Sequence, residues 1–271
     1  MIDATVGTGG HAEALLESGV RTVVGVDRDQ SALRLAAARL SRFGDRFRTV
    51  RSPFSRLAEA AAAAGVEQAG GVLFDLGVSS MQLDDAQRGF SYRASGPLDM
   101  RMGEADGRRT AADVVNTYRE EELVRVIAEY GEERFARRIA RAIVRARERR
   151  PISTTDELAA IVAGAVPRRR GGPHPARRTF QALRIEVNRE LEELAASLPQ
   201  AAGLLEPGGR LVVLSYHSLE DRIVKRFIAS EPRLVSLSKK PLRASVREAS
   251  ANPRARSARL RAAERMSEQA A

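Results

Sequence analysis

The stretch that decides the fold is Asp3-Ala4-Thr5-Val6-Gly7-Thr8-Gly9-Gly10-His11. Its apolar start predicts a short strand over 3–6, its glycines predict a tight turn, and a helix is expected from His11 to Ser18. Glycines let the backbone approach a ligand where a Cβ would clash, and a helix N-terminus adds exposed N–H groups with a partial positive charge. The stretch therefore predicts a strand–turn–helix unit that can hold a ligand at its turn.

A carboxylate follows at the end of the next predicted strand. Residues 22–27 read Thr-Val-Val-Gly-Val-Asp and place Asp27 20 residues after Gly7. In nucleotide-binding α/β sheets, an acid about 20 residues beyond the glycine turn holds a ribose hydroxyl. The two segments predict half of a pocket for a ligand that carries adenosine. The turn alone does not separate NAD from S-adenosylmethionine, and such turns also occur with no ligand.

Short apolar runs alternate with helical stretches over residues 2–100 and return near the C-terminus. Strands are predicted at 3–6, 22–27, 47–50, 71–76 and 210–215. Helices are predicted at 11–18, 30–42, 54–64, 120–129, 132–149 and 177–197. Two more are predicted by their first residues, one at the capping box of Thr154 and one at Ser218. Because strands and helices alternate, we expect an α/β fold with a doubly wound, mostly parallel sheet. We expect residues 1–105 and 177–271 to form this domain and residues 106–176 to form an inserted all-helical domain.

Composition excludes several kinds of protein. The 271 residues contain no cysteine, which excludes disulfides, thiolate metal sites and cysteine nucleophiles. Three histidines stand far apart without metal-ligand spacing, so we expect no metal. No window is apolar enough to span a membrane and no signal peptide precedes the first strand, so we expect a cytoplasmic protein.

The chain is strongly basic, with a formal net charge of +10. Ten lysines and arginines against two glutamates lie between Arg233 and Arg265, and this tail predicts either a nucleic-acid arm or a solvated, disordered segment. A second group of arginines follows one side of the predicted helix 132–149, which is typical of a solvated face or of a phosphate-binding one. The charge therefore favours a polyanion as partner.

Polar residues follow three of the predicted strands. Asp27 ends the second strand, Asp75 ends the fourth, and Tyr216-His217-Ser218 follows the strand at 210–215. Ligands of open parallel sheets bind at these carboxyl ends. Two carboxylates attract a sulfonium or an amine and repel a pyrophosphate, so this arrangement favours S-adenosylmethionine over NAD.

Several longer runs resemble the bacterial 16S ribosomal RNA cytosine-N4 methyltransferase family. The similarity covers nearly the whole chain. The runs that carry it lie at 3–11, 75–84 (Asp-Leu-Gly-Val-Ser-Ser-x-Gln-Leu-Asp), 88–91 (Arg-Gly-Phe-Ser), 97–102 (Pro-Leu-Asp-Met-Arg-Met), 174–176 (His-Pro-Ala), 179–188, 215–222 (Ser-Tyr-His-Ser-Leu-Glu-Asp-Arg) and 252–261.

The resemblance implies a class I methyltransferase-like domain with an inserted helical domain for substrate recognition. It implies methyl transfer from S-adenosyl-L-methionine to N4 of a cytidine in the 16S rRNA, in the decoding centre of the small ribosomal subunit. It also implies a leading segment before the glycine turn, of which only Met1 and Ile2 stand here. By position, the cofactor-binding residues would be Gly9, Gly10 and His11 at the methionine end, Asp27 at the ribose, Phe54 beside the adenine, and Asp75 and Gln82 completing the pocket.

For the chemistry, the candidate residues are Asp75, Asn188 and His217. Asp75 is the candidate acceptor for a proton of the target amine, with Ser79, Ser80 or Asn188 assisting. Asn188 can instead cap or bridge helices, and His217 either orders the turn before the last predicted helix or transfers protons.

Other functions stay open on the residues alone. They are a methyltransferase for DNA amines or a small molecule, an NAD-linked oxidoreductase, and a non-catalytic RNA-binding factor. Pairing with a second copy as a homodimer stays open as well.

Overall fold

The computed structural model describes residues 1–103, 107, 109–167, 172 and 174–267, and these form two compact units. The sheet unit comprises residues 1–77 and 191–271, and the helical unit comprises residues 78–190. The insert is thus wider than the predicted 106–176, whose first residue lies outside the described residues. The reason is that the segment after Gly77 buries Phe90, Leu98 and Met100 in the core of the helical unit, together with Leu183.

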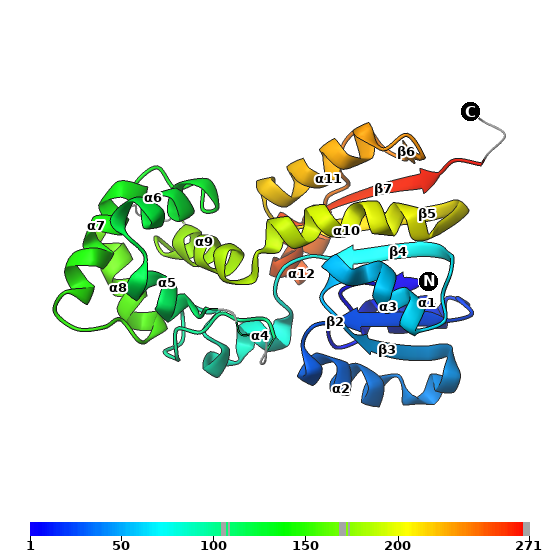
Figure 1. Ribbon diagram of the computed structural model, residues 1–271, viewed down its shortest axis with the longest axis horizontal. Helices are drawn as coiled ribbons and strands as arrows, with labels where there is room; N and C mark the ends of the chain where they lie inside the picture. The colour runs from blue at the N-terminus through cyan, green and yellow to red at the C-terminus, as the bar shows by residue number, and fades with distance from the viewer. Residues whose placement is uncertain (104–106, 108, 168–171, 173, 268–271) are drawn as a thin grey trace. The chain divides into compact units, whose positions relative to one another are not determined.

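Seven strands of the described residues form one sheet in the order β3-β2-β1-β4-β5-β7-β6 (Figure 1). The strands β1 to β5 run parallel, and β7 runs antiparallel to both β5 and β6. Their bounds are β1 Ile2–Asp3, β2 Val23–Asp27, β3 Phe47–Arg51, β4 Ala69–Asp75, β5 Leu205–Ser215, β6 Leu234–Ser236 and β7 Arg259–Arg265. The predicted doubly wound, mostly parallel sheet is confirmed.

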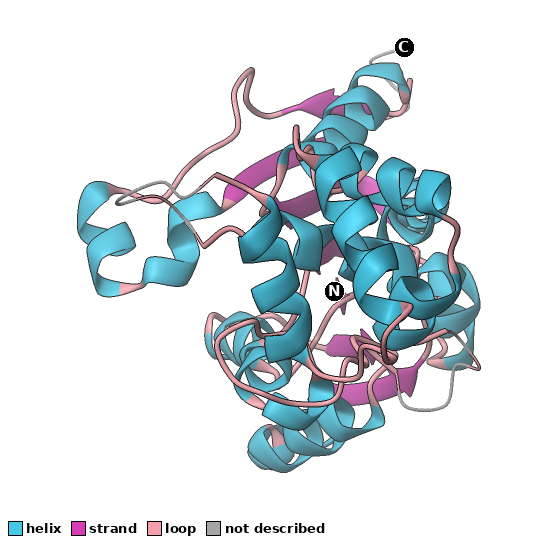
Figure 2. Ribbon diagram, turned by 90° about the vertical axis from the view of Figure 1, so that its left-hand side faces the viewer, coloured by secondary structure: helices cyan, strands magenta, loops and turns pink. Residues whose placement is uncertain are grey.

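Helices cover both faces of this sheet, and all strands belong to the sheet unit in the part of the chain described (Figure 2). Side chains alternate along β2, so that Val23 joins one apolar cluster with Leu16 and Leu33, while Val24 joins another with Leu57. The helices that form these two layers are α1 Gly10–Glu17, α2 Gln30–Arg39, α3 Leu57–Ala63, α10 Glu190–Leu204 and α11 Ser218–Ser230, whereas α12 Val246–Ala251 buries none of its residues. Burial of these two layers stabilises the sheet from both sides.

The helical unit is built around α7, which contacts α6 and α8 (Figure 1). Its named helices are α4 Ser80–Asp84, α5 Ala111–Thr117, α6 Glu120–Glu129, α7 Ala136–Arg147, α8 Thr155–Ala165 and α9 Arg177–Asn188. The capping box predicted at Thr154 is present and opens α8. The predicted helix 132–149 begins later, at Ala136, because Glu132 has a positive φ of 46° that an α-helix does not allow.

The single long helix predicted over 177–197 is wrong. Arg189 adopts a left-handed backbone with φ 52°, which ends α9 at Asn188, and α10 begins at Glu190. Arg184 Nε lies 2.8 Å from Glu190 Oε1 and bridges the break. The division between the two units falls directly after Glu190.

The basic tail is not a disordered segment over residues 259–265, because these residues form β7 inside the sheet. Arg261 Nε donates to Asp221 Oδ1 at 2.7 Å, and Arg233 pairs with Glu231, so part of the tail's charge is neutralised within the fold. In the described part of the chain, no helix combines the length and the apolar character needed to cross a membrane.

Candidate cofactor site at the strand ends

Three carboxylates stand at the ends of adjacent parallel strands. Asp3 ends β1, Asp27 ends β2 and Asp75 ends β4, and β1 lies between the other two. The chain leaves β1 toward β2 on one side and enters β4 on the other, so these ends flank the point where the winding of the sheet reverses. Open α/β sheets bind ligands at such a point. The predicted meeting of Asp27 and Asp75 at one edge of the sheet is thus present.

The glycine turn lies directly above this edge. Gly7 and Gly9 both have positive φ, 52° and 86°, and α1 begins at Gly10. The φ of 86° favours glycine at position 9, and a Cβ there would lie 3.0 Å from Leu40 Cδ1, so the Leu40 side chain would have to shift to admit it. The turn leaves the first N–H groups of α1 free of intrahelical partners, as in other helix N-termini that face anionic or polar ligand groups.

Asp27 ties the glycine turn to the second strand. Its Oδ2 accepts a hydrogen bond from the Gly7 N–H at 2.9 Å, and its Oδ1 accepts one from the Asp29 N–H at 2.9 Å. Burial raises the pKa of Asp27, and the two backbone hydrogen bonds oppose that rise. Each carboxylate oxygen keeps a second lone pair for a ligand hydroxyl. This geometry is compatible with the predicted contact between Asp27 and a ribose, which stays a prediction.

Asp75 is held by two side chains. His11 Nε2 lies 3.1 Å from its Oδ2, and the Tyr216 hydroxyl donates to its Oδ1 at 2.7 Å. Its backbone N–H donates to Thr5 Oγ1 at 2.6 Å. The hydrogen bond to Asp75 raises the pKa of His11, while burial and the charge of Asp75 raise the pKa of Tyr216. The structure thus joins His11 and Asp75, both predicted, with Tyr216 in one network.

Asp3 is the site residue that the sequence analysis missed. It is fully buried, and its Oδ1 accepts one hydrogen bond from the Thr5 N–H at 3.2 Å. Its Oδ2 has no hydrogen-bond partner among the described residues. Burial raises the pKa of Asp3 to about 7, helped by the negative charges of Asp75 and Asp27 and opposed by the Thr5 hydrogen bond and by His11. The available signal was its position before the glycine turn, at the end of a strand.

Phe54 comes from the edge of the sheet next to Asp27. It lies in a short helical turn, η2 Phe54–Arg56, that follows β3. The Ser52 N–H donates to the Asp27 carbonyl at 3.0 Å and keeps this segment beside β2. The Phe54 ring packs edge-on against Phe74 at a centroid distance of 5.9 Å and is half-buried. The predicted contact of Phe54 with adenine stays a prediction.

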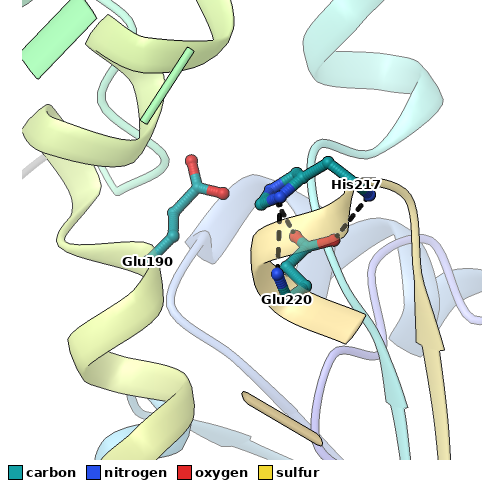
Figure 3. Close-up of side chains that lie close together, drawn as sticks. All are labelled: Glu190, His217 and Glu220. Atoms are coloured by element: carbon teal, nitrogen blue, oxygen red, sulfur yellow. Dashed lines mark hydrogen bonds and ion pairs between the residues drawn. The ribbon is translucent and has the colours of Figure 1, made fainter. Parts of the chain in front are cut away.

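His217 caps a helix. It is the N-cap of α11, its Nδ1 accepts from the Glu220 N–H at 3.5 Å, and its own N–H donates to Glu220 Oε2 at 3.3 Å (Figure 3). The Tyr216 N–H donates to the same oxygen at 2.8 Å. Of the two roles predicted for His217, these contacts favour the ordering of the turn after β5. That turn holds the Tyr216 hydroxyl against Asp75.

Gln82 and Asn188 belong to the helical unit and order one of its loops. Asn188 Oδ1 accepts from the Met102 N–H at 2.8 Å, and Asn188 Nδ2 donates to the Met100 carbonyl at 2.7 Å. Gln82 Nε2 donates to the Met102 carbonyl at 3.4 Å, and its Oε1 accepts from the Ser79 N–H in a capping box. Both amides thus support the loop around Met100 and Met102. The predicted roles of Gln82 in the cofactor pocket and of Asn188 in the chemistry stay predictions.

Fold and strand-end site together define a class of protein. A doubly wound sheet with one antiparallel strand next to its edge, a glycine turn after β1, and acids after β1, β2 and β4 form the arrangement of class I methyltransferases.

Comparison with known proteins then gives the family. The model of the MraW methylase family matches residues 1–266. Ribosomal RNA small subunit methyltransferase H of Acidothermus cellulolyticus is 53% identical over 98% of this chain and 87% of its own length. The protein of the same name from Carboxydothermus hydrogenoformans is 50% identical over 98% of this chain and 91% of its own. A solved rRNA methylase from Streptococcus thermophilus matches with 13% identity and a TM-score of 0.43, over 98% of this chain and 86% of that one. The family match and the identity of half the residues show that this chain belongs to the MraW methylase family and is a methyltransferase, which confirms the resemblance.

Proposed function

We propose that this protein transfers the methyl group of S-adenosylmethionine to N4 of a cytidine in the 16S rRNA of the small ribosomal subunit. The observation that carries the proposal is the cluster of Asp3, Asp27 and Asp75 at the point where the winding of the sheet reverses. The printed name of the relatives, ribosomal RNA small subunit methyltransferase H, supports the substrate class. The net charge of +10 supports a polyanionic partner.

The residues at the strand ends fit this cofactor. Carboxylates attract a sulfonium and an ammonium, whereas the same carboxylates would repel the pyrophosphate of NAD. The buried carboxyl group of Asp3, whose Oδ2 has no partner in the described residues, lies close enough to Asp27 and Asp75 for their charges to act on it. Gly9, Gly10 and His11 would hold the methionine end, and Asp27 the ribose. When bound, S-adenosylmethionine supplies an activated methyl group on its sulfonium.

The protein's own contribution to the chemistry centres on Asp75. The N4 lone pair of cytosine is conjugated into the ring, so the free amine is a weak nucleophile. An acceptor for an N4 proton favours a pyramidal nitrogen and takes up charge as N4 forms its bond to the methyl carbon. Asp75 can accept this proton while it keeps its contacts with His11 and Tyr216, because each carboxylate oxygen has two lone pairs.

The two neighbours of Asp75 fix its direction and connect it to water. The Tyr216 hydroxyl and His11 hold one oxygen each, so the carboxylate cannot rotate freely. The His11 side chain is 47% exposed and offers the proton a path from Asp75 to solvent. Orientation of this kind lowers the barrier because the acceptor is aligned before the amine arrives.

The decisive experiment is mass analysis of the nucleosides from RNA methylated by the purified protein. Separated small subunits, naked 16S rRNA and duplex DNA are each incubated with S-adenosylmethionine, and the Asp75→Asn variant serves as control. We expect N4-methylcytidine from the ribosomal samples and little from the variant. A C5-methylated product, product from DNA alone, or no product from any substrate would refute the proposal.

A further inference from the structure

The outer face of α7 carries positive charge that the fold does not balance. Residues 134–150 contain eight arginines and a single acid, Glu148. The buried side of the helix is apolar and consists of Ile139, Ala140 and Ile143 together with Ala136. The arginines therefore project from the opposite, exposed side of an amphipathic helix. Arg137, Arg141 and Arg145 follow one another at every fourth position of α7, and Arg149 continues this spacing in the turn just after the helix ends at Arg147. We name these four residues the α7 arginine row.

Other arginines of this segment have partners within the helical unit. Arg147 donates to the Val115 carbonyl at 2.8 Å, and Arg150 lies 2.7 Å from Glu157 Oε1. Arg134 and Arg138 stack against the ring of Phe135, at 4.4 Å and 5.8 Å. These four are explained by packing and pairing inside the unit.

The arginine row differs from them. Arg141 has one long contact to Glu120, at 3.6 Å, and its side chain is 64% exposed. Within the described residues, Arg137, Arg145 and Arg149 form no ion pair, and all three are exposed. The row is thus a line of cations on a helix surface with almost no counter-charge from the fold.

This arrangement weakens α7 in two ways. Like charges at positions i and i+4 repel each other along a helix, and the row has that spacing twice within α7, between Arg137 and Arg141 and between Arg141 and Arg145. Arg137 also stands in the first turn of α7, where the helix dipole disfavours a cation, and this turn contains no acid. A surface serving only solubility would tolerate glutamate at some of these positions. Repeated cation spacing at a cost to the helix indicates an anionic partner.

We propose that the α7 arginine row binds the phosphate backbone of the RNA substrate, an inference that rests on the proposed function. Four residues of helix rise about 6 Å, so the guanidinium groups of Arg137, Arg141 and Arg145 can meet successive phosphates of one strand, with Arg149 just past the end of the helix. Arginine suits this partner because its planar fork donates two parallel hydrogen bonds to phosphate oxygens. Such contacts position RNA without reading its sequence.

The test removes the unpaired charges and keeps the helix. The row variant carries Arg137→Gln, Arg145→Gln and Arg149→Gln, and glutamine forms helices about as well as arginine. The control variant carries Arg119→Gln, Arg125→Gln and Arg178→Gln, which remove the same charge from the same unit at arginines that contact glutamates. Thermal unfolding of both checks the fold, and the row variant should unfold no earlier than the wild type because repulsion is relieved.

Binding of a 16S rRNA fragment is then measured by filter binding over a range of KCl concentrations. Each lost phosphate contact reduces the slope of log K against log salt by about 0.7–0.9, so the row variant should lose roughly 2 to 3 in slope and about 100-fold in affinity at 0.1 M salt. The control should stay within about twofold of the wild type. Unchanged affinity in the row variant, or an equal loss in both variants, would overturn the inference.

Methyl transfer at saturating RNA separates this inference from the proposed function. The row variant should reach the wild-type kcat with a raised KM, because the row positions RNA and takes no part in the chemistry. A wild-type protein that forms no N4-methylcytidine would refute the proposed function. Selective loss of RNA binding in the row variant would still support the inference that the α7 arginine row binds RNA phosphates. A row variant with normal KM and reduced kcat would count against the inference that the α7 arginine row binds RNA phosphates.

Discussion

The buried carboxyl group of Asp3 makes the stability of this protein depend on pH in a direction opposite to that of most carboxylates. Burial raises the pKa of Asp3 from 3.8 to about 7 in the folded protein. Between these values the folded state binds a proton that the unfolded state has lost, so the free energy of unfolding falls as the pH rises. The stabilisation is complete below about pH 4 and is lost by the time the pH passes about 7.

The size of this effect follows from the two pKa values of Asp3. A difference of about 3 in pKa corresponds to roughly 4 kcal/mol of unfolding free energy between pH 4 and pH 8. Asp3 is fully buried, so solvent screening does not reduce this figure. The pKa values of His11 and Asp27 are raised as well and add to the same downward trend in the wild type. A variant at Asp3 alone is needed to isolate the contribution of Asp3 to the pH dependence of the unfolding free energy.

The variant Asp3→Asn removes the titrating group and keeps the shape. Its amide oxygen can still accept from the Thr5 N–H, while its NH₂ group takes the place of the unpartnered Oδ2 and leaves a buried donor without a partner. The informative quantity is therefore the change with pH in the stability difference between variant and wild type. We expect that difference to move in favour of the variant by roughly 3–4 kcal/mol from pH 4.5 to pH 8.

Urea unfolding followed by circular dichroism at half-unit steps of pH measures this difference. Thr5→Ser, a change next to Asp3 that adds no titrating group, serves as control and should give a difference from the wild type that does not vary with pH. A stability difference between Asp3→Asn and wild type that is equal at pH 4.5 and pH 8 would show that Asp3 does not titrate in this range. The burial argument for its raised pKa would then be wrong.

Three further changes test the strand-end site. Asp75→Asn should lower kcat by about 10²–10⁴ in single-turnover methyl transfer at saturating donor, and an unchanged rate under these conditions would remove Asp75 as proton acceptor. Tyr216→Phe removes the hydroxyl that holds Asp75 and should lower kcat about tenfold without loss of thermal stability; an equal rate would mean that the hydrogen bond does not orient the carboxylate. Gly9→Ala should destabilise the fold by about 1–2 kcal/mol and weaken donor binding in calorimetry, because of its φ of 86° and the 3.0 Å approach to Leu40. Gly19→Ala has a similar φ of 95° but open space around it, so it should lose only the part of the stability that comes from φ and should keep donor binding.

Much of the fold was predictable because its signals are local. The glycine turn, the strands that end on Asp27 and Asp75, and the capping box at Thr154 each depend on residues within a few positions of one another. Alternation of strands and helices then restricts the sheet to right-handed crossovers, which bring those strand ends to one edge. For these reasons the sequence places His11 and Asp75 at the same edge of the sheet, while the hydrogen bond between them is seen only in the structure.

Features that depend on distant contacts needed the tertiary structure. The environment of Asp3 arises because β1 lies between β2 and β4, which surrounds its carboxyl with two other acids and excludes water. The helix break at Arg189 and the wide helical unit depend on which core receives each apolar side chain, and pattern alone does not assign a core. The sequence by itself thus determined the class of fold and most strand-end groups, through short-range propensity and periodicity. Only the tertiary structure decided which of those groups are buried, paired or left without a partner, because burial and electrostatic fields are set by neighbours far apart in the chain.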